Sequence, residues 1–287
     1  FLSSATNLVD GDRNGRTDVF VRNRTTGETE RVPVPLGHES TDADWVTISH
    51  DGRFVAFSRG AAFLYDRFDR VLTPVSTATP GGTAVAAAQP RVSASGRYVV
   101  FLTPAQLEPA DTNAVVDVYR FDRLSGTNLL VSRGATAANG GSSAPTISGD
   151  GSRVAFSSLA NNLVAGDTNA RSDVFVRDIA AGTTMRISTN VDAQPTTIDA
   201  RDPFISTDGL HVGYLLSSNV LTSEATASSD VYVARTDGSV IRGPLNGISE
   251  GTGTTEGAYD PTLSMFGRFL VFRSYAPTLA AGDITFI

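Results

Sequence analysis

The sequence predicts an all-β protein, a β-propeller of four-stranded antiparallel blades with a count of six blades. Three observations support this prediction: a repeat of about fifty residues, glycine turns between short apolar runs, and the lack of sustained helical periodicity. Short strands separated by turns at regular intervals are typical of all-β folds. Dense apolar runs such as RVAF and DVFV suit strands that are covered on both faces, as radially packed blades would be.

A turn frame recurs five times along the chain and reads apolar-Ser-x-x-Gly-x-x-apolar-x-aromatic. Asp-Gly between apolar runs indicates a hairpin, because glycine adopts a positive φ without steric cost. Each frame therefore predicts a tight turn that joins the first two strands of a unit. The turn glycines lie 44, 55, 58 and 58 residues apart and are Gly52, Gly96, Gly151, Gly209 and Gly267.

A second frame follows the first and begins with an aspartate ahead of an apolar run, as in DVFV and DVYR. A turn such as TTGET or LSGTN then leads to one more apolar run. Each unit therefore predicts four strands: a proline-led entry strand, the strand after the Asp-Gly turn, the strand that starts with aspartate, and an outer strand. The aspartates of the second frame are Asp18, Asp117, Asp173 and Asp230.

The repeats divide a single predicted domain, 1–287, into units at about 1–40, 41–87, 88–144, 145–199, 200–258 and 259–287. The first unit lacks its entry strand and the last stops soon after its second strand. We expect the two ends to complete one blade together and close a ring. The opening run FLSSATNLV resembles the middle of an element, so flanking sequence is expected, and missing blades would raise the count to seven or eight.

Composition excludes several classes of function. Thirty acidic and 23 basic side chains give a net charge of −7, which argues against a nucleic-acid partner because phosphate binding needs clustered cations. All the basic residues are arginine, which excludes a catalytic lysine. The chain has no cysteine, so it forms no disulfide or thiolate site, and no apolar run is long enough to predict a transmembrane segment. The oligomeric state is left open.

The repeat resembles that of the bacterial TolB-like, or WD-like, propellers, whose units carry Ser-x-Asp-Gly followed by an aliphatic-Ala-Phe-Ser strand. Asp51-Gly52 with Phe57-Ser58, and Asp150-Gly151 with Phe156-Ser157, match this pattern well. The turns at Gly96 and Gly267 lack the aspartate. The resemblance covers nearly the whole chain and implies the fold more firmly than any activity. It also implies protein contacts in the cell envelope.

The first unit contains a candidate calcium loop between its second and third strands. The loop reads D-x-D-x-N-G-x-x-D and places oxygen side chains at Asp10, Asp12, Asn14 and Asp18, with the carbonyl of Arg16 as a further ligand. Calcium takes six to eight oxygen ligands, and alternating Asp and Asn on a tight loop direct them toward one point. The loop resembles the calcium loops of integrin α-subunit propellers, and it lacks the last glutamate of an EF-hand.

The loop recurs with losses in later units. The third and fourth units keep three of its oxygen positions, the fifth keeps Glu224 and Asp230, the sixth keeps Asp283, and the second has no such loop. Asx-turns, in which Asp or Asn bonds the nearby backbone, are the structural alternative in every unit. The candidate ligands of the third and fourth units are Asp111, Asn113, Asp117, Asp167, Asn169 and Asp173.

Catalysis is not favoured by the residues at hand. The three histidines, His38, His50 and His211, fall in a connection, a turn and the start of a strand, where each is expected to be a local structural residue. Carboxylates from different blades could still form a pair in a central channel, as in some propeller glycosidases. Trp45 lies in an entry strand, where core packing is favoured over sugar stacking.

The long loops and the blade-to-blade connections are predicted to share one face, which we call the loop-rich face. The sequence thus predicts a non-catalytic, calcium-stabilised propeller, secreted, periplasmic or on the cell surface, that binds a protein or cell-surface partner through this face. Bound calcium implies an extracellular or periplasmic location. One alternative is a carbohydrate-active propeller, a lyase or glycosidase with carboxylates in its channel. Another is the propeller module of a larger surface protein.

Overall fold

The computed structural model describes residues 1–189, 198–216, 230–237, 240–241 and 258–274. They belong to two compact units, 1–131 and 132–287. All regular elements in the described residues are β-strands. No helix in this part of the chain is long and apolar enough to cross a membrane.

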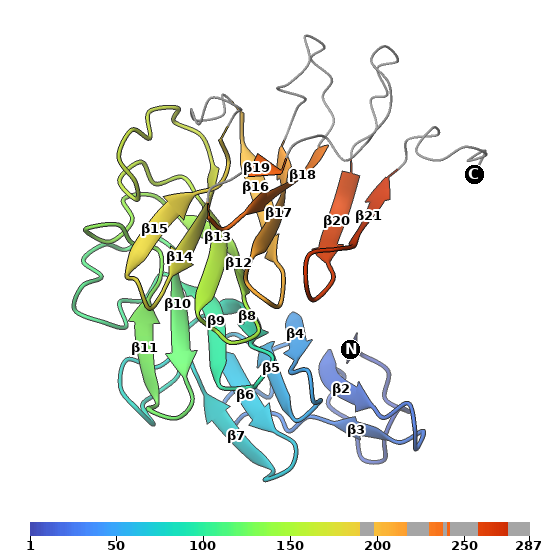
Figure 1. Ribbon diagram of the computed structural model, residues 1–287. Coiled ribbons are helices and arrows are strands. Elements are labelled where there is room, and N and C mark those ends of the chain that lie inside the picture. Colours follow the sequence, from blue (N-terminus) through green and yellow to red (C-terminus); the bar gives the residue numbers. More distant parts are fainter. Residues whose placement is uncertain (190–197, 217–229, 238–239, 242–257, 275–287) are drawn as a thin grey trace, which may run out of the picture. The chain divides into compact units, whose positions relative to one another are not determined.

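The first unit contains three antiparallel sheets, which we number blades 1 to 3 after the predicted repeats. Blade 1 has the order β1-β2-β3, blade 2 has β4-β5-β6-β7, and blade 3 has β8-β9-β10-β11 (Figure 1). The strands are β1 (Leu2–Ser3), β2 (Asp18–Arg22), β3 (Thr29–Arg31), β4 (Trp45–Ile48), β5 (Phe54–Ser58), β6 (Ala62–Asp66), β7 (Val71–Pro74), β8 (Ala88–Val92), β9 (Tyr98–Thr103), β10 (Asp117–Asp122) and β11 (Thr127–Leu130).

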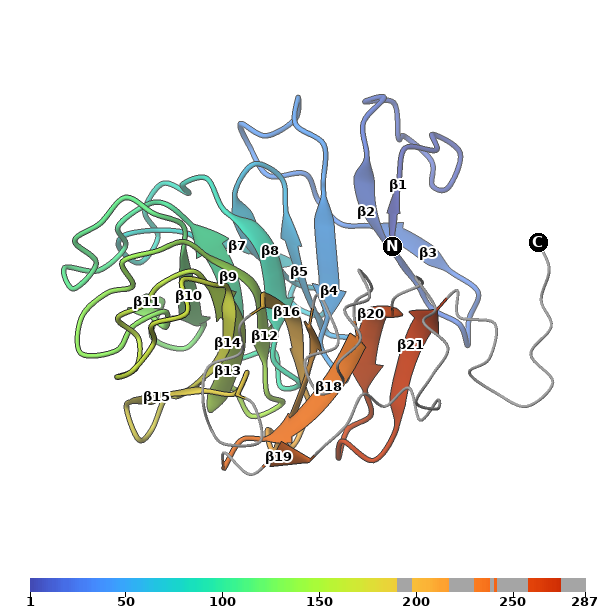
Figure 2. The same ribbon diagram turned by 90° about the horizontal axis from the view of Figure 1, so that it is seen from above.

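The second unit contains blades 4 to 6 and can be followed from green β12 to red β21 (Figure 2). Blades 4 and 5 each have four strands in sequence order, and blade 6 has two within the described residues. The strands are β12 (Ser142–Ile147), β13 (Arg153–Ser158), β14 (Asp173–Asp178), β15 (Thr183–Arg186), β16 (Ala200–Ile205), β17 (His211–Leu216), β18 (Asp230–Arg235), β19 (Val240–Ile241), β20 (Ala258–Leu263) and β21 (Leu270–Ser274).

These sheets confirm an all-β fold built from four-stranded antiparallel blades. Blades 2 to 5 are complete, and blade 1 lacks its entry strand, as the repeat predicts. The predicted boundary between 144 and 145 falls inside β12, whereas the boundaries before 88 and 200 coincide with the start of β8 and β16. The predicted boundary between 258 and 259 also falls inside a strand, β20.

The Asp-Gly turns are held by a serine two residues before the aspartate. In blade 2, Ser49 Oγ donates to Asp51 Oδ1 at 2.6 Å and accepts from Phe54 N at 2.9 Å. Gly52 follows with a φ of +73°. The same Ser-to-Asp bond occurs in blades 4 and 5. The serine of the repeat thus closes the turn, because it ties the aspartate to the first residue of the next strand.

The core lies within and between the sheets. All residues of β5 and β6 are buried, which agrees with strands covered on both faces. Aromatic residues on the second and third strands stack inside each blade, for example Phe156 on Phe175 with ring centroids 5.9 Å apart. The same stack recurs in blades 1, 2, 3 and 5. Stacked pairs of this kind add stabilisation beyond the buried area.

Entry strands carry a feature that the sequence analysis missed. In β8, β12 and β16 the register shifts by a β-bulge ahead of a proline. The bulged residues Gln89, Ala144 and Asp202 have φ values of +51°, +49° and +51°. Such values are uncommon for residues other than glycine, and proline normally keeps its predecessor in the β region. The motif x-Pro in an entry strand therefore indicates a bulge here.

In blades 2, 3 and 4, an arginine–aspartate pair joins the start of the second strand to the end of the third strand. In blade 2, Arg53 Nε donates to Asp66 Oδ1 at 2.9 Å and its Nη2 donates to Oδ2 at 2.6 Å. Arg97 holds Asp122 in the same way in blade 3. The hydrogen bonds from Arg53 lower the pKa of the Asp66 carboxyl below its ordinary value.

Asp66→Asn is expected to remove a pH-dependent part of the stability. Because the pKa of Asp66 is lower in the folded than in the unfolded state, its carboxylate stabilises the fold at pH values above the unfolded-state pKa. This stabilisation is lost as the pH falls through the folded-state pKa. The melting temperature of Asp66→Asn should lie below that of the wild type near neutral pH, and the difference should shrink below about pH 4. Melting curves from neutral pH downward test this, with exposed Asp10→Asn as the control. A difference that is constant down to the most acid sample would contradict it.

Candidate functional site

Three loops are candidate sites, each considered by itself: they join the second and third strands of blades 1 and 3 in the first unit and of blade 4 in the second. Each loop ends at an aspartate that is the first residue of the third strand and is fully buried. An earlier aspartate of each loop is also buried. The buried pairs are Asp12 with Asp18, Asp111 with Asp117, and Asp167 with Asp173.

An asparagine links the two halves of each loop in the same way. In blade 1, Asn14 Nδ2 donates to Asp18 Oδ2 at 2.8 Å, and Asn14 Oδ1 accepts from Arg16 N at 2.9 Å. The equivalent bonds from Asn113 and Asn169 have lengths of 3.1 and 2.7 Å to the strand aspartate. Their side-chain oxygens also accept a backbone N–H two residues on. The asparagine oxygen, a predicted calcium ligand, thus forms an Asx-turn.

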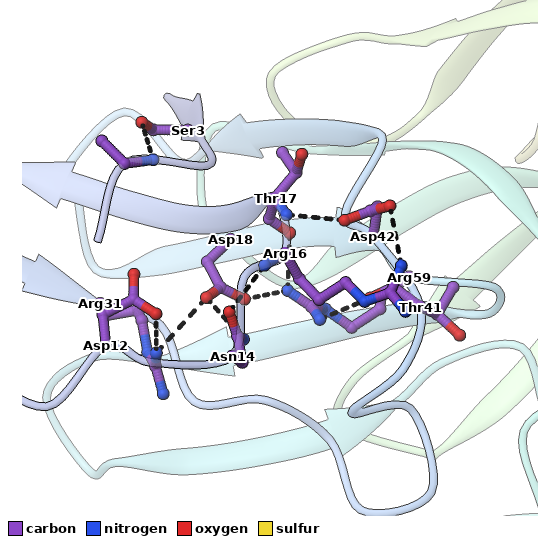
Figure 3. Close-up of polar contacts among 11 residues, drawn as sticks. Ser3, Asp12, Asn14, Arg16, Thr17, Asp18, Arg31, Thr41, Asp42 and Arg59 are labelled. Atoms are coloured by element: carbon purple, nitrogen blue, oxygen red, sulfur yellow. Dashed lines mark hydrogen bonds and ion pairs between the residues drawn. The ribbon is translucent and has the colours of Figure 1, made fainter.

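Arg31 reaches both buried carboxylates of blade 1 (Figure 3). Its Nη1 lies 2.7 Å from Asp12 Oδ1 and 3.4 Å from Asp18 Oδ2. Arg31 is the last residue of outer strand β3 and is in register with Phe20 of β2. Strand pairing therefore places its guanidinium beside the loop, at the point where the carboxylates of Asp12 and Asp18 converge.

A second arginine reaches Asp18 from blade 2, which has no long loop. Only three residues separate β5 from β6 there, and Arg59 is the first of them. Its guanidinium hydrogen-bonds Asp18 Oδ1, and it also donates to the carbonyl oxygens of Thr17 at 2.8 Å and Thr41 at 2.5 Å (Figure 3). The Arg59 side chain is only 2% exposed. It therefore ties blade 2 to the loop of blade 1.

Blade 4 repeats the arrangement of blade 1 with a different second donor. Arg186 of β15 lies opposite Phe175, with Nη1 3.4 Å from Asp167 Oδ1 and 4.0 Å from Asp173 Oδ2. Ser188 Oγ donates to Asp173 Oδ1 at 2.5 Å. Burial raises the pKa of both the Asp167 and the Asp173 carboxyl. The buried arginine therefore supplies the positive charge that these carboxylates need.

Blade 3 has a tyrosine hydroxyl where blades 1 and 4 have arginine. Tyr119 is in register with Leu130, so no arginine stands at this position of the outer strand. Tyr119 Oη donates to Asp111 Oδ2 at 2.6 Å and accepts from Leu107 N at 3.1 Å. Burial raises the pKa of the Tyr119 hydroxyl, which keeps it protonated as a donor. A shallow hollow beside Asp111 is lined by Gln106, Leu107, Glu108, Pro109, Asp111 and Thr112.

The structure brings together some of the predicted ligands and separates others. Asp12 and Asp18 meet at Arg31 and Asn14 bonds Asp18, whereas Asp10 is exposed. The side chain of Arg16 turns to Asp42, with Nη1 and Oδ2 3.6 Å apart. Within the residues that the structure describes, no three His, Asp or Glu side chains gather as a metal site. Glu224 and Asp283 lie outside the described residues, and Asp230 is described only as the first residue of β18.

Sequence reasoning missed Arg31, Arg59 and Arg186. These arginines lie 13 to 41 residues from the loop carboxylates they contact within their own unit. A register argument could have found two of them, because Arg31 and Arg186 each lie opposite the aromatic residue of the third strand. No sequence signal of comparable strength points to Arg59.

The sixth loop position tests how backbone strain affects stability. Gly15 in blade 1 has a φ of +64° with nothing within 4 Å of an added Cβ, and Ala170 in blade 4 has a φ of +54°. Gly15→Ala is expected to destabilise the protein by about 1 kcal/mol, and Ala170→Gly to stabilise it by a similar amount. Denaturant titration of both variants measures this. Shifts of the same sign in the two variants would refute the strain argument.

His38, His211 and Trp45 make local packing contacts. The His38 ring lies edge-on to Phe63, with ring centroids 5.1 Å apart. His211 packs against Gly267, where an added Cβ would come within 2.5 Å of the imidazole. His50 is exposed in its turn. Trp45 has the guanidinium of Arg91 5.3 Å from its ring centroid, so one face of the indole is already in contact.

Comparison with known proteins identifies the fold. No protein-family model and no curated protein matches the chain. The β-propeller domain of the Trilobed protease from Pyrococcus furiosus superposes with a TM-score of 0.54 at 11% identity, covering 86% of this chain and 68% of that one. A structure assigned as TolB from Agrobacterium tumefaciens has a TM-score of 0.40 at 16% identity, covering 91% and 99% of the two chains.

Hydrazine synthase of Kuenenia stuttgartiensis aligns with a TM-score of 0.43 at 15% identity, covering 81% of this chain and 55% of that one. At 11% identity, the match to the Pyrococcus domain shows architecture and not activity. Together with the antiparallel four-stranded sheets, the match to the Pyrococcus domain shows that this chain has the β-propeller fold.

Proposed function

We propose that the protein is a non-catalytic binding propeller, outside the cytoplasm, that holds a protein or cell-surface partner through the loops between its second and third strands. The location rests on the resemblance of its repeats to envelope propellers. Loops on a rigid scaffold are the usual place of binding in such folds. The contacts of Trp45 and the histidines favour structural roles for these residues over catalytic ones.

One observation supports this proposal most strongly: in each of three long polar loops, a segment is held at both ends by a pair of buried aspartates. In blade 1, Asp12 and Asp18 are 4% and 0% exposed, while Arg13 between them is exposed. In blade 3, Thr112 is exposed beside buried Asp111. These segments are therefore fixed at both ends, while Arg13 and Thr112, which we call the loop tips, face solvent. A preorganised loop loses less conformational entropy on binding, which favours recognition.

A change of charge at the loop tips tests the proposal. Binding to the cell-envelope fraction of the producing organism is measured by co-sedimentation for the wild type, for the double variant Arg13→Glu with Thr112→Glu, and for Arg24→Glu. Arg24 is exposed in the turn between β2 and β3 and serves as the matched control. The loop variant should bind about tenfold more weakly, as expected for a central contact, and the control like the wild type. Equal binding by all three proteins would reject the proposal.

Calcium stabilisation is the second part of the proposal, and it applies to the blade 3 loop of Asp111, Asn113 and Asp117. Leu130 holds the position of the arginine there, and the hollow beside Asp111 is open to solvent. An ion that binds only the folded state raises the melting temperature with its concentration. The protein should melt at a lower temperature in EDTA than in excess calcium. Identical melting in both would remove calcium from the proposal.

A further inference from the structure

We propose that Arg31 in blade 1 and Arg186 in blade 4 act as built-in cations that neutralise the acidic loops, so that these two loops are closed without a metal ion. Arg31 contacts two carboxylates that the loop motif would offer to calcium. Arg186 does the same for Asp167 and Asp173. The inference concerns blades 1 and 4 alone and does not depend on the partner-binding proposal.

The oxygen atoms that calcium would need in blade 1 are already engaged. Asp12 Oδ1 and Asp18 Oδ2 both accept from Arg31, and Asp18 Oδ1 accepts from Arg59. Asn14 turns its amide N–H toward Asp18 and its oxygen toward the backbone N–H of Arg16. A calcium ion requires six to eight oxygen ligands. The motif should supply four of these ligands from side chains. Asp12 and Asp18 are bonded to guanidinium groups, Asn14 forms an Asx-turn, and Asp10 is exposed.

Charge balance in blade 1 points the same way. The carboxylates of Asp12 and Asp18 carry two negative charges, and the guanidinium groups of Arg31 and Arg59 carry two positive charges. Asp18 and Arg59 are almost completely buried, where an excess charge is costly. A divalent cation would add two positive charges to a cluster that is already neutral. The donor set of blade 1 therefore suits arginine and not calcium.

Blade 4 supports the inference through an independent feature. The Arg186 side chain is 8% exposed, and its Nε and Nη1 make no hydrogen bond although Nη1 is ion-paired with two carboxylates. A buried guanidinium with unused donors is costly unless it offsets buried negative charge. Asp167 and Asp173, at 2% and 0% side-chain exposure, carry that charge. Arg186 is thus held in place by electrostatic attraction to the loop.

Blade 3 serves as an internal comparison. Phe20 and Phe175, which cannot donate a hydrogen bond, lie opposite Arg31 and Arg186. Tyr119, whose hydroxyl donates to Asp111, lies opposite Leu130. The loop thus receives a donor from the outer strand in two blades and from the third strand in the other. The loops of blades 1 and 4 therefore receive a cation from the outer strand, and the blade 3 loop receives a neutral donor.

The test compares calcium dependence of melting in Arg31→Met and in the wild type, with exposed Arg24→Met as the matched control. Removing the guanidinium of Arg31 takes a positive charge away from the carboxylates of Asp12 and Asp18. Arg31→Met should therefore have a lower melting temperature than the wild type in EDTA. Calcium should raise its melting temperature more than that of the wild type or of Arg24→Met. Arg186→Met should behave in the same way. An equal response of all variants to calcium, or unchanged melting of Arg31→Met in EDTA, would overturn the inference.

Arg31→Lys keeps the test decisive where Arg31→Met does not fold. Lysine retains the positive charge next to Asp12, so this variant should fold in EDTA and respond to calcium no more than the wild type. Titration calorimetry, which measures the binding of calcium to the metal-free wild type, gives a second readout. Arg31→Lys that folds only with calcium, or wild-type binding that is lost on Asp12→Asn, would overturn the inference.

Discussion

Replacing Arg59 by methionine is expected to lower the free energy of unfolding by about 3–5 kcal/mol, the cost of removing one partner from a buried ion pair. Arg59 is the largest side chain that is almost completely buried in the described residues. Its loss leaves the carboxylate of Asp18 without one of its two guanidinium partners and removes a donor from the carbonyl groups of Thr17 and Thr41. The Thr17 carbonyl keeps the N–H of Ala43.

Denaturant titration measures this effect, with Arg24→Met as the exposed control, which should change stability by less than about 0.5 kcal/mol. The double variant Arg59→Met with Asp18→Ala should lose less than the sum of the single losses, because both charges are then absent. Ala61 already occupies the equivalent place in blade 2, so alanine is compatible with the blade. A loss below about 1 kcal/mol for Arg59→Met would contradict the importance assigned to this contact.

Gly96→Ala is expected to destabilise the protein by about 3 kcal/mol through two effects that add. Gly96 has a φ of +71°, which costs alanine about 1–2 kcal/mol. An added Cβ would also lie 1.9 Å from Cδ2 of the Phe54 ring, so the buried ring must move. Overpacking of this kind costs about 1–3 kcal/mol. The turn of blade 3 thus requires glycine because blade 2 packs directly against it.

Gly81→Ala separates the two effects, since Gly81 has a φ of +69° and nothing within 4 Å of its added Cβ. The loss of stability in Gly81→Ala should therefore equal the cost of the positive φ alone, about 1–2 kcal/mol. The double variant Gly96→Ala with Phe54→Leu should be less than additive, because the smaller side chain makes room for the Cβ. Equal losses for Gly81→Ala and Gly96→Ala would show that the contact with Phe54 contributes nothing.

The sequence predicted the strands because their signals are local. A hairpin turn such as Ser49-His50-Asp51-Gly52 contains all the atoms that stabilise it, and the next strand begins two residues later. The buried aspartate at the start of the third strand was also predictable from its repeat. Asn14, Asn113 and Asn169 were found for the same reason, although the structure uses their oxygens in Asx-turns.

The partners of the loop carboxylates were not predictable from local patterns. Arg59 reaches Asp18 across 41 residues and from a neighbouring blade, so its contact depends on how the sheets pack. Arg31 depends on the register of β3 against β2, and a shift by one residue would point it to the other face. The bulges at Gln89, Ala144 and Asp202 each precede a proline, a signal that the hydrophobic pattern of the repeat does not contain.

A crystal structure grown in excess calcium tests the central claim, that arginine completes the acidic loop of blade 1, most directly. We expect Arg31 Nη1 within hydrogen-bond distance of Asp12 Oδ1, as in the present structure, and no ion between Asp12 and Asp18. A calcium ion bound by the carboxylates of Asp12 and Asp18, with the guanidinium of Arg31 turned out to solvent, would contradict it.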